Sequence, residues 1–163
     1  MRQNKRGQTP FIATNNRGQS PISLPVPLDP QLRAAYEATD YVVFAEPELV
    51  IRIGEPNPDL DALMEAAEAS TAAFLTAANP DGELQSDEEN RAALAELRAS
   101  ELLRLRPLYD GEGRDPLGKW PAEPSLLVVG ITRDDAVFIG VSHAQNAIVF
   151  VEKGRAPELV VLV

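Results

Sequence analysis

The sequence predicts an α+β fold, in which a mixed or antiparallel sheet of about six or seven strands carries three main helices. Two observations lead to this class. Short apolar runs typical of strands recur along the chain, and longer segments with apolar residues at helical spacing lie between them. The composition is that of an ordinary globular protein, with 44% hydrophobic and 25% charged residues. A chain of 163 residues is about one domain long, so we expect one core.

Local signals predict where the elements begin and end. A short first helix precedes three longer ones, which begin at residue types that cap helices, namely Asn57, Ser86 and Thr132. The expected helices span residues 31–38, 58–69, 87–102 and 132–144. The expected strands span residues 41–45, 48–53, 72–77, 104–109, 125–131, 147–152 and 158–162. The first two strands flank Glu46 and Pro47 and should form a hairpin.

The first 28 residues differ from the rest, and we expect a disordered basic arm ahead of a single α+β domain over residues 29–163. The arm is rich in Gln, Asn, Gly, Pro and Ser, and a five-residue motif at residues 6–10 returns almost unchanged at 17–21. Such an arm would serve as a tether or a targeting peptide. Alternatively, it is translated from DNA upstream of a true start near Asp29.

Charge argues against nucleic acid as a partner of the folded part. The chain has 15 basic and 25 acidic residues, and four of the basic ones precede the first acid. Residues 29–163 therefore hold 11 basic against 25 acidic residues, a net charge of −14 that repels a phosphate backbone. No apolar run reaches the length that a bilayer crossing needs, so we expect no membrane partner.

Cysteine is absent, which excludes thiol catalysis, disulfides and sulfur-ligated zinc. His143 is the only histidine, so a histidine-rich metal site is excluded as well. We therefore expect no metal and no cofactor. The absence of cysteine is consistent with the reducing cytoplasm, which is where we expect the protein. His143 lies at the end of an expected helix, where a cationic imidazole favours a capping role.

The segment at residues 111–124 is the densest candidate for a binding loop. It holds acids, bases, three glycines and the only tryptophan. Glycine allows close approach of backbone to a ligand, and loops present such groups from a rigid scaffold. We expect Arg114 and Trp120 to contact a ligand. In the alternative, Arg114 pairs with a nearby carboxylate and Trp120 covers the edge of the sheet.

Glu123 is the candidate catalytic residue, because it comes just before an apolar strand. Burial raises the pKa of a carboxyl group and suits it to acid–base chemistry. Glu112 or Asp115 would supply a second carboxylate. In the alternative, Glu123 accepts a salt bridge or caps backbone amides at the strand start.

Four amide side chains complete the candidate ligand-binding set. Asn79 and Asn90 lie at an expected strand end and helix start, which are neighbours if the chain reverses at residues 79–82. Gln145 and Asn146 lie in the turn after the last expected helix, where they either cap carbonyls or face a cleft. In the alternative, the asparagines satisfy backbone groups in turns.

Several motifs follow one another in a specific order, namely Leu49–Gly54, Phe74–Pro80, Ser86 with Glu89 and Asn90, Gly111–Gly113, Trp120–Ser125 and Gln145–Ala147. This order resembles a bacterial family known only as domain of unknown function 3293. The resemblance implies no activity. It does draw attention to a set of polar residues that we expect to converge on one site, namely Asn79, Asn90, Glu123, Gln145 and Asn146.

Taken together, these patterns favour a binding or interaction module that recognises a polar small molecule or a protein. The alternative is a metal-independent hydrolase or transferase that uses Glu123 with Glu112 or Asp115 as acid and base, and Arg114 for an anionic group. The sequence does not decide between these classes, and it does not indicate an oligomeric state.

Overall fold

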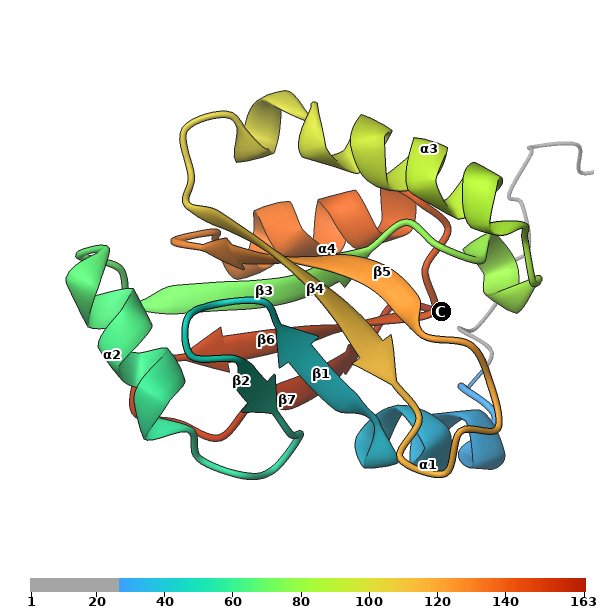
Figure 1. Ribbon diagram of the computed structural model, residues 1–163, viewed down its shortest axis with the longest axis horizontal. Helices are drawn as coiled ribbons and strands as arrows, with labels where there is room; N and C mark the ends of the chain where they lie inside the picture. Colours follow the sequence, from blue (N-terminus) through green and yellow to red (C-terminus); the bar gives the residue numbers. More distant parts are fainter. Residues whose placement is uncertain (1–26) are drawn as a thin grey trace, which may run out of the picture.

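The structure, a computed structural model, describes residues 27–163, so nearly all of the predicted arm lies outside the described residues. Its elements are α1 (Pro30–Ala38), β1 (Asp40–Val43), β2 (Leu49–Ile51), α2 (Pro58–Ala66), β3 (Thr71–Thr76), η1 (Pro80–Gly82), α3 (Asp87–Arg98), η2 (Glu101–Leu103), β4 (Leu108–Arg114), β5 (Glu123–Val129), α4 (Arg133–Ser142), β6 (Ala147–Glu152) and β7 (Glu158–Val161). Figure 1 shows how they are arranged. The predicted α+β class is confirmed.

The strands form one seven-stranded sheet in the order β2-β1-β4-β5-β3-β6-β7, and every neighbouring pair is antiparallel. The sheet is therefore antiparallel rather than mixed. The predicted hairpin is present as β1 and β2, with Val42 opposite Val50. Strand β3 has Phe74 opposite Leu127 of β5 on one side and opposite Val149 of β6 on the other.

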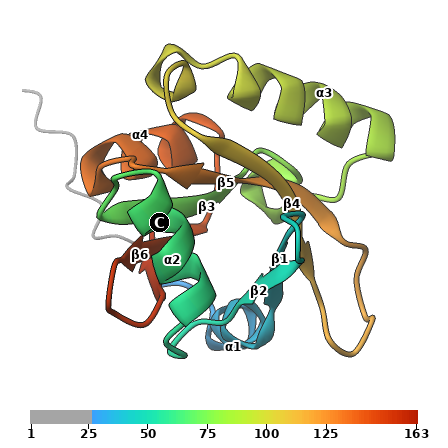
Figure 2. The same ribbon diagram turned by 60° about the vertical axis from the view of Figure 1, so that its left-hand side comes forward.

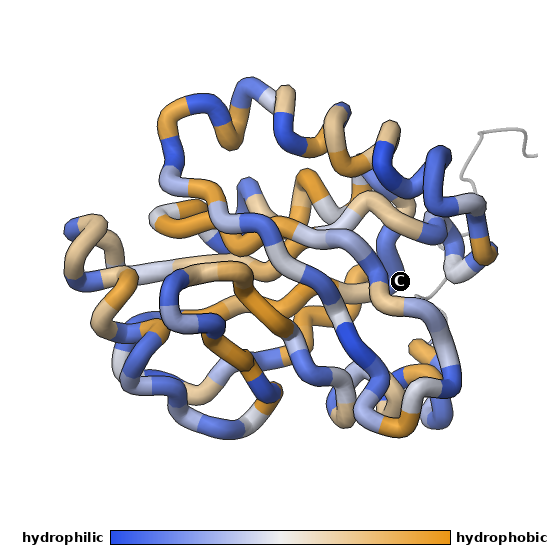
Figure 3. The backbone as a smooth tube through the Cα atoms, in the orientation of Figure 1, coloured by the Kyte–Doolittle hydropathy of each residue, from blue (hydrophilic) through white to orange (hydrophobic). Residues whose placement is uncertain are grey.

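The sheet is curled, and its two faces bury separate apolar clusters. On the concave face, residues of β1 and β2 meet residues of β6 across the interior, and α2 adds Leu60 and Met64. On the other face, α3 and α4 pack through Leu97, Ala136 and Ile139. Figures 1 and 2 show α3 and α4 together on one side of the sheet and α1 and α2 near its two opposite ends. Figure 3 shows hydrophobic and hydrophilic stretches alternating along α3, as expected for a helix with one buried face.

The helix starts follow from the caps that the sequence indicated. Asn57 Oδ1 accepts a hydrogen bond from the Leu60 amide at 3.0 Å, and Asn57 Nδ2 donates to the Val50 carbonyl at 2.9 Å. Ser86 and Glu89 form the full capping box at the start of α3. These caps satisfy amides that have no partner within the helix, so they fix where α2 and α3 begin.

The prediction of a strand over residues 104–109 was wrong, because the chain turns there and the strand begins at Leu108 and continues to Arg114. As a consequence, Gly111 and Gly113 lie within β4 and not in a loop, and the connection to β5 comprises residues 115–122. The strand needs a glycine at Gly111 for packing, since a Cβ there would lie 2.2 Å from the Val42 carbonyl oxygen. This close approach of β1 holds the two strands together.

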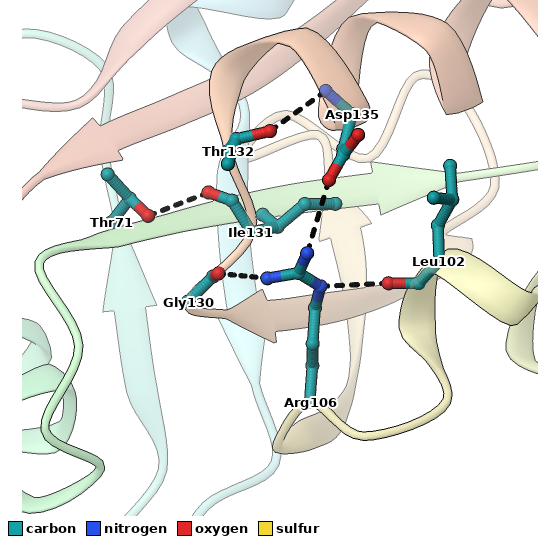
Figure 4. A network of polar contacts seen from close by, with 7 residues as sticks. All are labelled: Thr71, Leu102, Arg106, Gly130, Ile131, Thr132 and Asp135. Carbon is teal, nitrogen blue, oxygen red and sulfur yellow. Dashed lines mark hydrogen bonds and ion pairs between the residues drawn. The ribbon is translucent and has the colours of Figure 1, made fainter.

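Arg106 explains why the chain turns before β4 (Figure 4). Its guanidinium donates to the Leu102 carbonyl at 2.8 Å, to the Gly130 carbonyl, and to the Asp135 carboxylate at 3.1 Å. One side chain thus joins the start of β4 to the end of β5 and the first turn of α4. A planar guanidinium with five donors suits this role, because it can satisfy several carbonyls at once.

Candidate functional site

A pocket of about 380 Å³ lies at the end of the sheet opposite the Arg106 network, between α1 and the concave face. Volumes of this size are typical of sites for small organic molecules. Four aromatic side chains from separate parts of the chain line it, and these are Tyr36, Tyr41, Phe74 and Trp120. Helix α1 covers this end loosely, because none of its residues is fully buried.

The apolar wall of the pocket is fixed by packing. The rings of Tyr41 and Phe74 meet edge to face with their centroids 5.3 Å apart, a favourable geometry for two aromatic rings. The Tyr41 hydroxyl donates to the Tyr36 carbonyl at 2.8 Å, so β1 holds the last turn of α1 over the pocket. Burial raises the pKa of the Tyr41 hydroxyl, which therefore remains protonated and keeps this hydrogen bond.

Glu123 is the carboxylate of this pocket. It opens β5 on the concave face, and Asn79 Nδ2 donates to its Oε1 at 2.7 Å. Among residues 27–163, no other side chain or amide donates to the carboxylate, and the second oxygen is not sealed off from solvent. Burial raises the pKa of Glu123, and the hydrogen bond from Asn79 opposes this shift in part. Glu123 is thus an anchored carboxylate with one oxygen free to bind a ligand.

Asn79 is held in place by Asn90. The backbone amide of Asn79 donates to Asn90 Oδ1 at 3.0 Å, and the side-chain Nδ2 of Asn90 donates to Asn79 Oδ1 at 3.0 Å. The Gln85 amide also donates to Asn79 Oδ1 at 2.9 Å. Asn79 adopts a left-handed backbone conformation, with φ of 48°, which asparagine tolerates better than most residues. Asn90 is only 7% exposed, so it acts as a positioning residue and does not line the pocket.

Gln145 and Asn146 line the pocket from the turn between α4 and β6. Gln145 Nε2 donates to the Ala78 carbonyl at 3.0 Å and to the His143 carbonyl at 3.2 Å, so it fastens this turn to the end of β3. The Asn146 side chain contacts Tyr36. Burial raises the pKa of the Tyr36 hydroxyl, and the contact with Asn146 opposes the shift. His143 is the C-cap residue of α4, and its backbone amide donates to the Ile139 carbonyl at 3.1 Å.

Glu112 and Arg114 face away from this pocket. Side chains alternate along a strand, and Gly111 and Gly113 take the concave positions of β4, next to Phe74 and opposite Glu123. Glu112 and Arg114 therefore lie on the other face, where they pair with each other, and Arg114 Nη1 lies 3.6 Å from Glu48. The structure does not bring Glu112 to Glu123, and it does not bring Arg114 to a ligand in the pocket.

The connection from β4 to β5 forms one side of the pocket mouth. Asp115 lines the pocket, and its two oxygens accept hydrogen bonds from the Leu117 amide at 3.0 Å and the Lys119 amide at 2.7 Å. These bonds shape the turn that carries Trp120, whose side chain is 49% exposed. Trp120 thus lies at the mouth, as a residue that is half in contact with the pocket and half in solvent.

The structure brings together Asn79, Asn90, Glu123, Gln145 and Asn146 through shared contacts, with Trp120 and Asp115 at the mouth. Sequence reasoning missed Tyr36 and Tyr41 as pocket residues, although they lie in the expected first helix and first strand. The apolar face of the first helix was the available signal, but nothing local shows that this helix folds over the end of the sheet.

In the described part of the chain, no three acidic or histidine side chains are grouped as metal ligands. Within residues 27–163, none of the helices has both the length and the apolar character that a bilayer crossing requires.

Comparison with known proteins gives one match. Residues 75–148 match the family model described as "Protein of unknown function (DUF3293)". This segment runs from β3 to the start of β6, and it includes Asn79, Glu123 and Asn146 but not Tyr36 or Tyr41. No curated protein and no solved structure matches the chain.

Proposed function

Residues 75–148 match the DUF3293 family model, whose description assigns no activity, so we propose a function from the pocket itself. The protein is a binding module for a small organic molecule that carries a hydrogen-bond donor. The donor group binds Glu123, and the rest of the molecule lies against the aromatic wall.

The observation that supports this proposal best is the carboxylate of Glu123, of which only one oxygen accepts a hydrogen bond from the described residues. Burying a carboxylate costs free energy unless its oxygens are hydrogen-bonded. Asn79 satisfies one oxygen, and among residues 27–163 no donor reaches the other. Burial raises the pKa of Glu123, so keeping this carboxylate charged costs folding free energy. Such a cost is typical of a functional site, where a ligand can supply a partner for the second oxygen.

The shape and composition of the pocket favour a small molecule over a protein partner. A concave site lined mainly by apolar and aromatic side chains, with few polar groups, is the usual form of a small-molecule site. The pocket offers Tyr41, Phe74 and Trp120 as apolar contacts, and Glu123 and Asn146 as polar ones. Few polar contacts at fixed positions give orientation and specificity, while the apolar area gives most of the affinity.

We place this activity in the cytoplasm, without nucleic acid as a partner. The absence of cysteine supports a location where disulfides are not needed. The net charge of −14 over residues 29–163 supports the second point, since such a field repels phosphate.

A second function is favoured by the raised pKa of Glu123. A carboxyl group that holds its proton closer to neutral pH can act as a general acid or base, as in a metal-independent hydrolase or transferase. Of the two carboxylates considered as its partner, only Asp115 shares the pocket, and both its oxygens are engaged by loop amides. If the protein is an enzyme, Glu123 therefore acts alone. Chemical change of a bound ligand by wild type but not by Glu123→Gln would support this function.

The test of the binding function uses Trp120 as a built-in reporter. It is the only tryptophan of the chain and lies at the pocket mouth, so its fluorescence reports a ligand that enters. The full chain is screened against a library of small organic fragments, and each hit is repeated with Glu123→Ala and Glu112→Ala. Glu112 is a matched control, because it is a carboxylate of the adjacent strand that faces the other side of the sheet.

We expect some fragments to change the fluorescence of wild type and of Glu112→Ala. The same fragments should bind Glu123→Ala about tenfold more weakly, because one hydrogen bond to a charged group is lost. Thermal unfolding checks that both variants fold. If Glu123→Ala does not fold, Glu123→Gln replaces it, and the loss is then expected for positively charged fragments, because Gln keeps an acceptor oxygen but has no charge. Failure of the whole library, or equal binding to wild type and both variants, would contradict the proposal.

A further inference from the structure

The balance of charge and hydrogen-bonding groups around the pocket narrows the class of ligand. Resting on the binding function proposed above, we infer that the ligand is an organic ammonium ion with a hydrophobic body, whose N–H group donates to the free oxygen of Glu123. The inference follows from three properties of the pocket, which are its charge, its donors and acceptors, and its aromatic wall.

The charge of the pocket is negative. Among the described residues that line it, the acidic ones are Asp115 and Glu123, and the basic one is Lys119. These three charges sum to −1. Lys119 lies on the same exposed turn as Asp115, and within residues 27–163 no ion pair joins it to Glu123, so the charge of Glu123 has no partner of opposite sign in the pocket. Arg114 could have neutralised it, but it lies on the other face of the sheet and pairs with Glu112. An anionic ligand would therefore face an uncompensated like charge, whereas a cation would balance it.

Several hydrogen-bond donors of the pocket are already used within the protein. The Tyr41 hydroxyl is already used on the Tyr36 carbonyl, and Asn79 Nδ2 is used on Glu123. The Gln145 amide group is used on two backbone carbonyls. The free oxygen of Glu123 is an acceptor that lacks a partner. An ammonium group has only donors, so it complements this oxygen, whereas a carboxylate or a carbonyl would use the remaining donors of Tyr36, Trp120 and Asn146 and leave the Glu123 oxygen without a partner.

The aromatic wall also favours a cation. Aromatic ring faces carry negative charge density and attract ammonium groups, most strongly where water is excluded. Tyr36, Tyr41, Phe74 and Trp120 line the same pocket as Glu123. The carboxylate and the rings therefore act in the same direction, and the apolar area left over accommodates a hydrophobic body.

The test compares three probes that share one ring and differ in charge, namely benzylammonium, benzyl alcohol and benzoate. The full chain is titrated with each at neutral pH, and binding is followed by Trp120 fluorescence and by protein NMR shifts. We expect benzylammonium to bind about tenfold more tightly than benzyl alcohol, because its hydrogen bond is charge-assisted, and benzoate to bind least.

Two variants separate the pocket from the general acidic surface. In Glu123→Gln the preference for benzylammonium over benzyl alcohol should disappear, because Gln keeps an acceptor oxygen but loses the charge. In Glu112→Gln, which removes a carboxylate from the other face, the preference should remain. Equal loss in both variants would mean that benzylammonium binds the surface non-specifically, and would overturn the inference.

A pH series gives an independent measurement should Glu123→Gln not fold. Burial raises the pKa of Glu123, and a bound ammonium favours the ionised form. The affinity for benzylammonium should therefore fall as the pH falls through the pKa of Glu123, while the affinity for benzyl alcohol changes little. An affinity for benzylammonium that is independent of pH would overturn the inference.

The outcomes distinguish this inference from the binding function on which it rests. If benzyl alcohol or benzoate binds wild type as tightly as benzylammonium, the pocket binds small molecules but the ammonium assignment is wrong. If none of the three probes binds, but other uncharged fragments bind wild type more tightly than Glu123→Ala, the binding function holds and the ammonium assignment is again wrong. If no fragment of any charge binds, both proposals fail.

Discussion

Substituting Asn90 tests the positioning network beneath the pocket. Asn90 is 7% exposed, and its side chain forms two hydrogen bonds with Asn79, one to the backbone amide and one to the side-chain oxygen. Asn90→Ala removes both. It also leaves the Asn79 amide without a partner in a partly buried place, while the Gln85 amide continues to hold the Asn79 oxygen. The Asn79 side chain would then hold Glu123 less firmly.

The expected magnitude follows from these contacts. Each hydrogen bond contributes about 1 kcal/mol, and an unpaired amide costs about as much again. Alanine recovers about 0.5 kcal/mol through its higher helix propensity in α3. The free energy of unfolding should therefore fall by about 2.5 kcal/mol.

The assay is equilibrium unfolding of the full chain in urea, followed by circular dichroism, with the midpoint and the slope fitted separately. The midpoint should fall while the slope stays unchanged, because the unfolded surface is the same. Arg91→Ala, one residue further on the exposed side of α3, is the control and should leave the midpoint nearly unchanged. A loss below about 0.5 kcal/mol for Asn90→Ala would refute the idea that Asn90 braces Asn79.

Three further changes test the sheet and the pocket. Gly111→Ala should lower the free energy of unfolding by about 2–3 kcal/mol, because the new Cβ would lie 2.2 Å from the Val42 carbonyl oxygen. Gly113→Ala is the control and should be tolerated, since its Cβ would lie 3.5 Å from Thr39 Cγ2. Similar urea midpoints for the two variants would contradict this. Because burial raises the pKa of Glu123, the folded state holds this proton more tightly than the unfolded state does. The stability of wild type should therefore fall relative to that of Glu123→Gln as the pH rises through the pKa of folded Glu123. A constant difference in urea midpoints between about pH 4 and pH 8 would contradict this. Arg114→Ala should leave the urea midpoint and fragment binding unchanged, since its ion pairs are solvent-exposed and on the other face of the sheet, and a loss of binding would place Arg114 at the site.

Features set by neighbouring residues could be predicted from the sequence. The caps at Asn57 and Ser86 depend on side chains within a few residues of the helix start, and both are present as expected. The turn after β3 predicted that Asn79 and Asn90 would be neighbours, and the chain reversal brings them into direct contact. Such features need no knowledge of the tertiary structure.

Features that depend on distant parts of the chain could not be predicted. The glycines at 111 and 113 are typical of a loop, but both lie in β4, and at Gly111 the backbone of β1 approaches too closely for a Cβ. The pairing of β4 with β5 sets which residues share a face, and it separates Glu112 from Glu123 although both were candidates for one acid–base pair. Tyr36 reaches the pocket only because α1 folds across the end of the curled sheet.

The position of a bound ligand is the measurement that tests the binding function most directly. A fragment that binds in the fluorescence screen is examined with the full chain by intermolecular nuclear Overhauser effects. We expect contacts from the fragment to the rings of Tyr36, Phe74 and Trp120, which line the same pocket as Glu123. Contacts confined to the region of Arg106, at the opposite end of the sheet, would contradict the assignment of this pocket as the functional site.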